Sequence, residues 1–125
     1  MMPERKSIPA RRIRLKRAYR PAATADGLRV LVDRLWPRGV KKLDAAIDLW
    51  VKNIAPSTAL RQWFDHDPAR WPQFRQRYAA ELRDHRKELA DLRAQARRRT
   101  VTLVFAARDE RRNDAVVLRN VLLGR

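Results

Sequence analysis

The chain has 125 residues, of which 30 are lysine or arginine and 14 are aspartate or glutamate, so its formal net charge is +16 at pH 7. This length and the 45% of hydrophobic residues predict one folded domain with a single core. The absence of cysteine excludes disulfides, thiolate metal sites and a cysteine nucleophile, and two histidines argue against a histidine-rich metal centre. No apolar run approaches the roughly 20 residues that span a bilayer, and no signal peptide is visible, so we expect a cytoplasmic protein without membrane contact.

The positive charge is concentrated at the N-terminus. Residues 1–20 hold eight basic side chains and one acidic one. With two prolines and few apolar residues, residues 1–11 are predicted to be a flexible basic arm ahead of a single domain over residues 12–125. Excess positive charge favours a nucleic acid, an anionic ligand or an acidic partner.

The first two strands are predicted over residues 13–19 and 28–35, separated by a turn that ends at Asp26-Gly27. Pro37 removes a ladder donor and Gly39 permits a positive φ, so an exposed turn follows the second strand. Open α/β sheets bind ligands at the carboxyl ends of their strands. The candidate ligand-binding residues here are Arg34, Trp36, Arg38 and Gly39, with Asp33 as a candidate base. The alternative is a strand-end ion pair with the tryptophan packed under its own turn.

A short helix is predicted over residues 44–53, and Ala55-Pro56 ends it. Ser57 or Thr58 then resembles an N-cap for a helix over residues 59–64. Ser57 has a second interpretation, because the free N–H groups of a helix N-terminus also bind anions. The two roles are compatible.

His66-Asp67-Pro68 also has two interpretations. Asp67 as an N-cap, followed by Pro68 in the first helical position, is a typical helix start. His66 lies just outside that helix and is either a proton carrier or an ordinary surface histidine.

Apolar residues from Phe74 to Ala96 recur at helical spacing. One helix of about 30 residues would be about 45 Å long, which exceeds the width of a domain of this size, so a break is predicted near residues 84–87. Four arginines would align beside the apolar stripe of an unbroken helix, either as a nucleic-acid surface or as a solvated face; these are Arg75, Arg86, Arg93 and Arg97.

Residues 100–106 are predicted to form a buried strand, because the segment is short, apolar and rich in β-branched residues. A loop over residues 106–109 leads to a closing helix, with Asp109 as its expected N-cap. Arg108 precedes that helix and is placed to hold an anion beside its N-terminus. The order of elements predicts an α/β fold, a small three-layer sandwich with a short, mostly parallel sheet flanked by helices. The loops after residues 33 and 106 should meet at one edge of the sheet.

Four groups of residues, taken in order, resemble the bacterial YeaO-like family, which belongs to a larger domain group of unknown function. They are Val32–Gly39, Asp48-Leu49-Trp50 with Ala55–Thr58, Trp63-Phe64 with His66-Asp67-Pro68, and Ala106–Glu110 with Asn113. The resemblance covers roughly residues 12–123 and implies a family without implying a reaction.

The resemblance also has departures. Some members of the larger group have a cysteine at the end of the last strand and a Cys-His-Arg run in the next helix, where this chain has Phe105 and Asn113-Asp114-Ala115. Thiol chemistry therefore cannot be carried across. The nearer relatives more often show Asn-His-Ala, so Asp114 argues against proton transfer at that position, while Arg108, Asp109 and Asn113 keep their match.

The favoured function is binding of, or catalysis on, a small anionic ligand such as a phosphate, nucleotide or carboxylate at the strand ends. Arg34, Arg38 and Arg108 would clamp the anion, because guanidinium groups suit phosphate and carboxylate. Asp33, Asp109 and His66 are the candidate bases, and Trp36, Gly39, Ser57 and Asn113 complete the ligand-binding set. The alternative is a nucleic-acid-binding or regulatory module that uses the basic arm and the arginine-rich helix. No metal, cofactor or oligomeric state is indicated, and the choice between enzyme and binding protein stays open.

Overall fold

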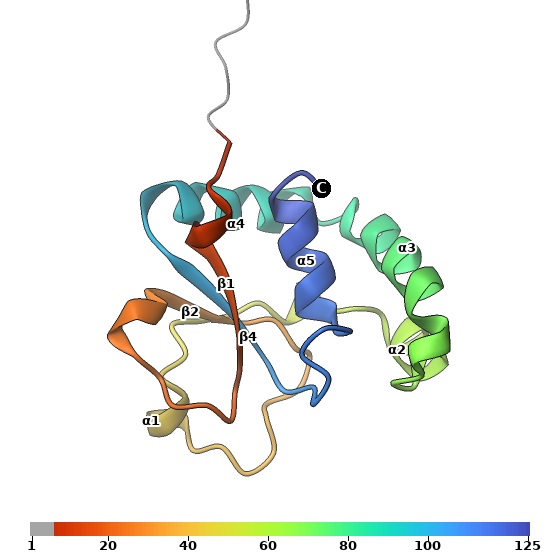
Figure 1. Ribbon diagram of the computed structural model, residues 1–125, viewed down its shortest axis with the longest axis horizontal. Coiled ribbons are helices and arrows are strands. Elements are labelled where there is room, and N and C mark those ends of the chain that lie inside the picture. The colour runs from red at the N-terminus through yellow and green to blue at the C-terminus, as the bar shows by residue number, and fades with distance from the viewer. Residues whose placement is uncertain (1–6) are drawn as a thin grey trace, which may run out of the picture.

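The computed structural model describes residues 7–125, and in that part of the chain a four-stranded, all-parallel sheet carries the helices (Figure 1). The strands, in sequence order, are β1 (Ile13–Arg17), β2 (Leu28–Leu31), β3 (Leu49–Trp50) and β4 (Val101–Phe105). They lie side by side in the order β1-β4-β2-β3. Every residue of β4 is buried, as expected for the central strand of a sheet covered on both faces. The predicted α/β class with a parallel sheet flanked by helices is confirmed.

The helices lie between and after the strands. They are α1 (Lys42–Ala45), α2 (Thr58–Phe64), α3 (Trp71–Leu82), α4 (Arg86–Arg98) and α5 (Asp114–Leu122), with short 3-10 turns at Ala10–Arg12, Thr24–Asp26, Lys52–Ile54 and Pro68–Arg70. The long apolar pattern is divided between α3 and α4, which confirms the predicted break. Arg83, Asp84 and His85 form the connection, and His85 is the N-cap of α4.

The two faces of the sheet are covered differently. On one face α5 packs against β1 and β4, with α3 and α4 beside it, over a core that includes Phe74, Leu103 and Leu118. The other face has a thinner cover, in which Trp36, Ile47 and Trp50 pack on a small cluster at the middle of the sheet.

The predicted helix over residues 44–53 is wrong. Helix α1 ends where Ala46 takes a left-handed conformation, with φ at 47°. The chain then extends, and Leu49 and Trp50 pair with β2 as an edge strand before the turn Lys52–Ile54. Of the apolar residues that suggested a helix, Ile47 and Trp50 pack in the thinner layer, whereas Ile54 joins the main core and Leu49 is exposed.

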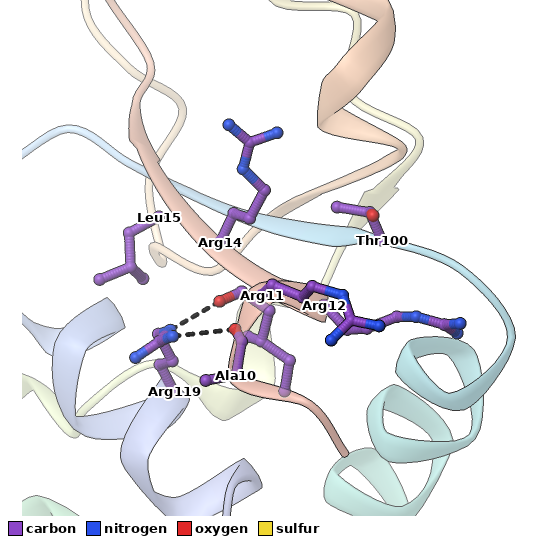
Figure 2. A pocket seen from close by; sticks show the side chains of 8 residues that line it. Ala10, Arg11, Arg12, Arg14, Leu15, Thr100 and Arg119 are labelled. Carbon is purple, nitrogen blue, oxygen red and sulfur yellow. Dashed lines mark hydrogen bonds between the residues drawn. The ribbon is translucent and has the colours of Figure 1, made fainter.

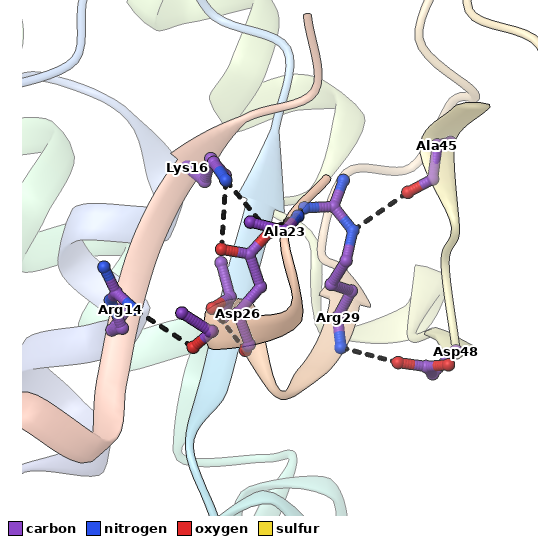
Figure 3. Close-up of polar contacts among 9 residues, drawn as sticks. Arg14, Lys16, Ala23, Asp26, Arg29, Ala45 and Asp48 are labelled. Atoms are coloured by element: carbon purple, nitrogen blue, oxygen red, sulfur yellow. Dashed lines mark hydrogen bonds and ion pairs between the residues drawn. The ribbon is translucent and has the colours of Figure 1, made fainter. Parts of the chain in front are cut away.

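A buried polar network supports this second face (Figure 3). Asp26, which is 3% exposed, accepts hydrogen bonds from Lys16 Nζ at 3.0 Å and from Arg29 Nη1 at 2.7 Å. Arg29 Nε donates to the Ala45 carbonyl at 2.9 Å, which holds α1 against the sheet. Burial by itself would raise the pKa of Asp26, but the Ala23 N–H and the two cations hold that pKa below its usual value.

The predicted flexible arm over residues 1–11 lies only partly within the described residues. Residues 1–6 lie outside the described residues. In the remainder of the predicted arm, Ile8 packs against the main core, and the Ala10 carbonyl accepts a hydrogen bond from Arg119 Nη2 at 2.9 Å. Ile8 and Ala10 therefore contact the rest of the domain, and the flexible arm stays a prediction.

Candidate functional site

The strand ends meet at one edge of the sheet, called the carboxyl edge below. Because all four strands are parallel, the segments that follow them leave the sheet on the same side. Asp33, after β2, accepts a hydrogen bond through Oδ2 from the Ala106 N–H, after β4, at 2.8 Å. Trp50 Nε1 donates to the Asp33 carbonyl at 2.7 Å. The predicted meeting of the two strand-end loops is therefore confirmed at Asp33 and Ala106.

Asp33 is paired with a second carboxyl group, Asp114, in the first turn of α5. The two side chains share a hydrogen bond, which requires one of them to hold a proton. Burial raises the pKa of Asp114 well above its ordinary value, and the negative charge of Asp33 raises it further. Burial also raises the pKa of Asp33, although the bonds from Asp114 and Ala106 and the charge of Arg61 oppose that shift. Both shifts favour a protonated carboxyl group in this pair, more strongly at Asp114 than at Asp33.

Tyr78 and Glu81, on α3, lie beside this pair. The Tyr78 hydroxyl donates to the Ile54 carbonyl at 2.6 Å, and its pKa is raised well above the ordinary value by burial and then by the charges of Asp114, Asp33 and Glu81. The Glu81 carboxylate accepts from the Ser57 N–H at 2.8 Å and from the Ser57 hydroxyl at 2.6 Å.

Ser57 is the N-cap of α2, as predicted, and its hydroxyl oxygen accepts from the Leu60 N–H at 3.1 Å. The anion expected at this helix start is supplied by the protein itself, since the Glu81 carboxylate binds the Ser57 N–H. A ligand role for Ser57 stays a prediction, and it would require displacement of Glu81.

Arg34, the residue after Asp33, is partly buried. Its Nη2 donates to the Pro56 carbonyl over 3.3 Å, and its Nε is buried without a hydrogen-bond partner among the described residues. The positive charge of Arg34 acts on the Tyr78 hydroxyl, and that of Arg61 acts on Asp33.

The turn after β2 has a largely structural role. Trp36 Nε1 donates to the Val40 carbonyl at 2.7 Å, and its ring contacts that of Trp50 edge to face at 5.5 Å, which agrees with the packing interpretation. Gly39 has φ at 78°, the conformation its sequence position suggested. Arg38 is exposed, and its carbonyl accepts from the Tyr19 hydroxyl at 3.0 Å. A hollow of about 480 Å³ lies beside this turn, lined in part by Tyr19, Gly39 and Lys41.

The loop after β4 corrects the predicted N-cap of α5. Asp109 caps the turn that lies between it and α5, because its Oδ1 accepts hydrogen bonds from the N–H groups of Arg111 and Arg112 at 3.0 and 3.1 Å. The bond from the Arg111 N–H is the largest of the effects that lower the pKa of Asp109. The true N-cap is the buried Asn113, which accepts from the Val116 N–H at 3.0 Å. Arg108 is exposed at the rim of this loop.

His66 is separate from this group in the contacts of the described chain. It follows the C-terminal end of α2, is exposed, has φ at 54°, and its ring packs near that of Phe64 with centroids 6.3 Å apart. The arginine row expected on a single long helix is divided by the α3–α4 break. Arg93 donates to the carbonyls of Val121 and Leu122 and so caps α5, while Arg75 lies over the Trp71 ring.

Three residues of the carboxyl edge were not among the predicted site residues: Asp114, Tyr78 and Glu81. A usable signal existed for Asp114, because it begins the helix that follows the loop after the buried strand β4. Tyr78 and Glu81 gave no such signal, because their positions on a helix resemble a core residue and a surface charge.

Over residues 7–125, no helix is both long and apolar enough to cross a membrane. In the same part of the chain, no three histidine, aspartate or glutamate side chains are grouped closely enough to hold a metal ion.

Comparison with known proteins identifies the family. A family model described as the inactive DUF488-N3 subclade matches residues 12–125. The uncharacterised protein YeaO of Escherichia coli is 47% identical over 109 residues, which are 85% of this chain and 92% of that protein. The uncharacterised proteins Rv3073c of Mycobacterium tuberculosis and Mb3100c of Mycobacterium bovis are each 45% identical over 114 residues, which are 91% of this chain and 96% of those proteins. No solved structure gives a significant match. The chain therefore belongs to the bacterial YeaO-like family of unknown function, within the DUF488-N3 subclade.

Proposed function

We propose that the chain binds a small anionic ligand, such as a phosphate, nucleotide or carboxylate, at the carboxyl edge and does not catalyse a reaction on it. The main observation in support is the Nε of Arg34, which is buried and has no partner in the described part of the chain. A buried donor without a partner costs about 1–3 kcal/mol, so a group that accepts its hydrogen bond stabilises the site. Guanidinium groups favour planar carboxylates and phosphates as acceptors.

The charges around Arg34 are compatible with an anion. The raised pKa of Asp114 favours its neutral form, which reduces the negative charge of the carboxyl pair, while the charge of Arg61 acts on Asp33 and that of Arg34 acts on Tyr78. Arg38 and Arg108 are exposed on the two loops that follow β2 and β4 and add positive charge at the rim. An anion would therefore meet more positive than negative charge as it approaches.

Binding without catalysis is favoured by the state of the candidate bases. Asp109 is a carboxylate whose lowered pKa makes it a poor proton acceptor, and His66 follows the far end of α2. Asp33 already shares hydrogen bonds with Asp114 and Ala106. The description of the matching family model as inactive agrees with this interpretation. Base roles for Asp33, Asp109 and His66 remain predictions.

The test is thermal stabilisation by inorganic phosphate, AMP and citrate at millimolar concentration, with affinities then measured by calorimetry. Arg108→Ala and Arg38→Ala change exposed side chains, so the fold should persist, and each should lose about 1.5–3 kcal/mol of binding, or about ten- to hundredfold in affinity. Arg83→Ala is the matched control, because Arg83 is an exposed arginine at the end of α3. The proposal fails if none of the three anions stabilises the protein, or if Arg83→Ala weakens binding as much as Arg108→Ala.

A further inference from the structure

The opposite edge of the sheet, called the amino edge below, carries a cluster of arginines without facing carboxylates. A hollow of about 570 Å³ lies there, and its lining includes Arg11, Arg12, Arg14 and Arg119 but no acidic residue (Figure 2). Helix α4 ends at the same edge, because it leads directly into β4, and it brings Arg97 and Arg98 in its last turn. Helix α5 returns to this edge as well, which places the C-terminal residue Arg125 there (Figure 1).

Two of these arginines hold the edge together. Arg12 Nη1 donates to the Arg97 carbonyl at 2.8 Å, which ties the segment before β1 to the end of α4. Arg119 donates through Nε to the Ile13 carbonyl at 2.6 Å and through Nη2 to the Ala10 carbonyl at 2.9 Å, as Figure 2 shows. The four segments that carry the arginines are therefore fixed relative to one another by backbone contacts rather than by ion pairs.

The remaining arginines are exposed: Arg11, Arg14, Arg97, Arg98 and Arg125. The C-terminus of a helix is stabilised by nearby cations, which explains Arg97 and Arg98 at the end of α4. This explanation does not apply to Arg11 or Arg14, which are not at a helix C-terminus of this kind. Arg14 Nη1 contacts the Ala25 carbonyl, and the neighbouring Asp26 carboxylate is buried and already bound by Lys16 and Arg29. The positive charges of these neighbouring arginines repel one another, and a bound polyanion would reduce that repulsion.

We propose that the amino edge binds the phosphate backbone of a double-stranded nucleic acid. Several guanidinium groups on one rigid edge match repeated phosphates better than one small anion. The hollow has no aromatic lining residue, so base stacking, which supports binding to single strands, has no platform there. The large apolar side chains exposed in the described chain are Tyr19, Leu35, Leu43 and Leu49, none of which lines the hollow, so nothing at this edge favours insertion into a lipid surface.

The test is fluorescence anisotropy with a short labelled DNA duplex, titrated with the full chain between about 50 and 200 mM salt. Wild-type protein should bind, with the logarithm of the affinity falling linearly with the logarithm of the salt concentration. The double variant Arg97→Ala/Arg98→Ala should bind about tenfold more weakly and reduce the salt slope by about two, because each lost phosphate contact removes about 0.9 from it. Arg11→Ala, in a different segment, should reduce the slope by about one.

The matched control is Arg83→Ala/Arg86→Ala. It removes two exposed arginines near the start of α4, about 16 Å along the helix from Arg97, and should leave the slope unchanged. Circular dichroism of each variant checks that the fold is retained. The proposal is overturned if the wild-type chain does not bind the duplex at the lowest salt, if the control loses as much as Arg97→Ala/Arg98→Ala, or if the single strand binds more tightly than the duplex. Arg38→Ala and Arg108→Ala test small-anion binding at the carboxyl edge, whereas Arg97→Ala/Arg98→Ala tests the duplex at the amino edge, so either proposal can fail alone.

Discussion

The carboxyl pair of Asp33 and Asp114 predicts how stability depends on pH. In Asp114→Asn the amide keeps the size of the carboxyl and a donor toward Asp33, but it cannot titrate. In the wild type, the raised pKa of Asp114 means that the folded chain holds a proton which the unfolded chain has released. The free energy of unfolding contributed by this group therefore falls as pH rises above the ordinary value of 3.8, until the folded pKa is reached.

The magnitude follows from proton linkage. One proton held only in the folded state lowers the free energy of unfolding by about 1.4 kcal/mol for each pH unit. The variant has no such proton, so the difference in stability, variant minus wild type, should increase by up to about 1.4 kcal/mol per pH unit over that interval. Near the ordinary pKa of an aspartate the two proteins should differ little, because the neutral amide and the neutral acid make similar contacts.

Urea unfolding followed by tryptophan fluorescence measures this difference, since the chain has four tryptophans. The series would run from about pH 4 to pH 8, where linkage acts. Asp84→Asn removes one exposed carboxylate and controls for the change in net charge. A difference for Asp114→Asn that stays constant with pH, or a carbon-13 titration that places Asp114 at the ordinary pKa of an aspartate, would refute the assignment of the shared proton.

Two further substitutions test contacts that support the carboxyl edge and the sheet. Glu81→Ala removes the acceptor for both the N–H and the hydroxyl of Ser57, so it should cost about 1.5–3 kcal/mol of stability in chemical denaturation, with Arg83→Ala near zero. Gly27→Ala would drive its Cβ into the Thr100 carbonyl oxygen at a φ of 63°, so a loss of stability above about 2 kcal/mol is expected. Gly124→Ala, also at positive φ but in open space, should cost only about 1 kcal/mol. Equal melting temperatures for the two glycine variants would contradict the close approach.

Sequence patterns predicted the elements whose identity depends on local composition. The buried strand over residues 100–106 and the break between α3 and α4 follow from β-branched residues and from the limited width of a small domain. Strand β3 was missed because two residues carry almost no periodicity, and its conformation depends on pairing with β2. The N-cap of α5 was placed at Asp109 because both Asp109 and Asn113 suit that position, and only the packed loop distinguishes them.

The candidate site was predicted in outline, because parallel strands bring Asp33 and Ala106 to one edge. Its interior was not predicted. Asp114 was interpreted as a departure that weakens proton chemistry, yet its pKa is raised well above the ordinary value by burial and by the charge of Asp33. A local pattern cannot show this, because the pKa shift arises from burial by elements far apart in the sequence.

The carboxyl edge and the amino edge of the sheet differ in which hydrogen-bond donors and positive charges remain without a partner in the described chain. At the carboxyl edge, the Glu81 carboxylate binds the start of α2, so the helix N-terminus that attracts an anion there already holds a carboxylate of the protein itself. The unpartnered Nε of Arg34 is the donor that remains there. At the amino edge, Arg12 and Arg119 donate to backbone carbonyl groups, and several other arginines are exposed. This distribution favours one small anion at the first edge and an extended polyanion at the second.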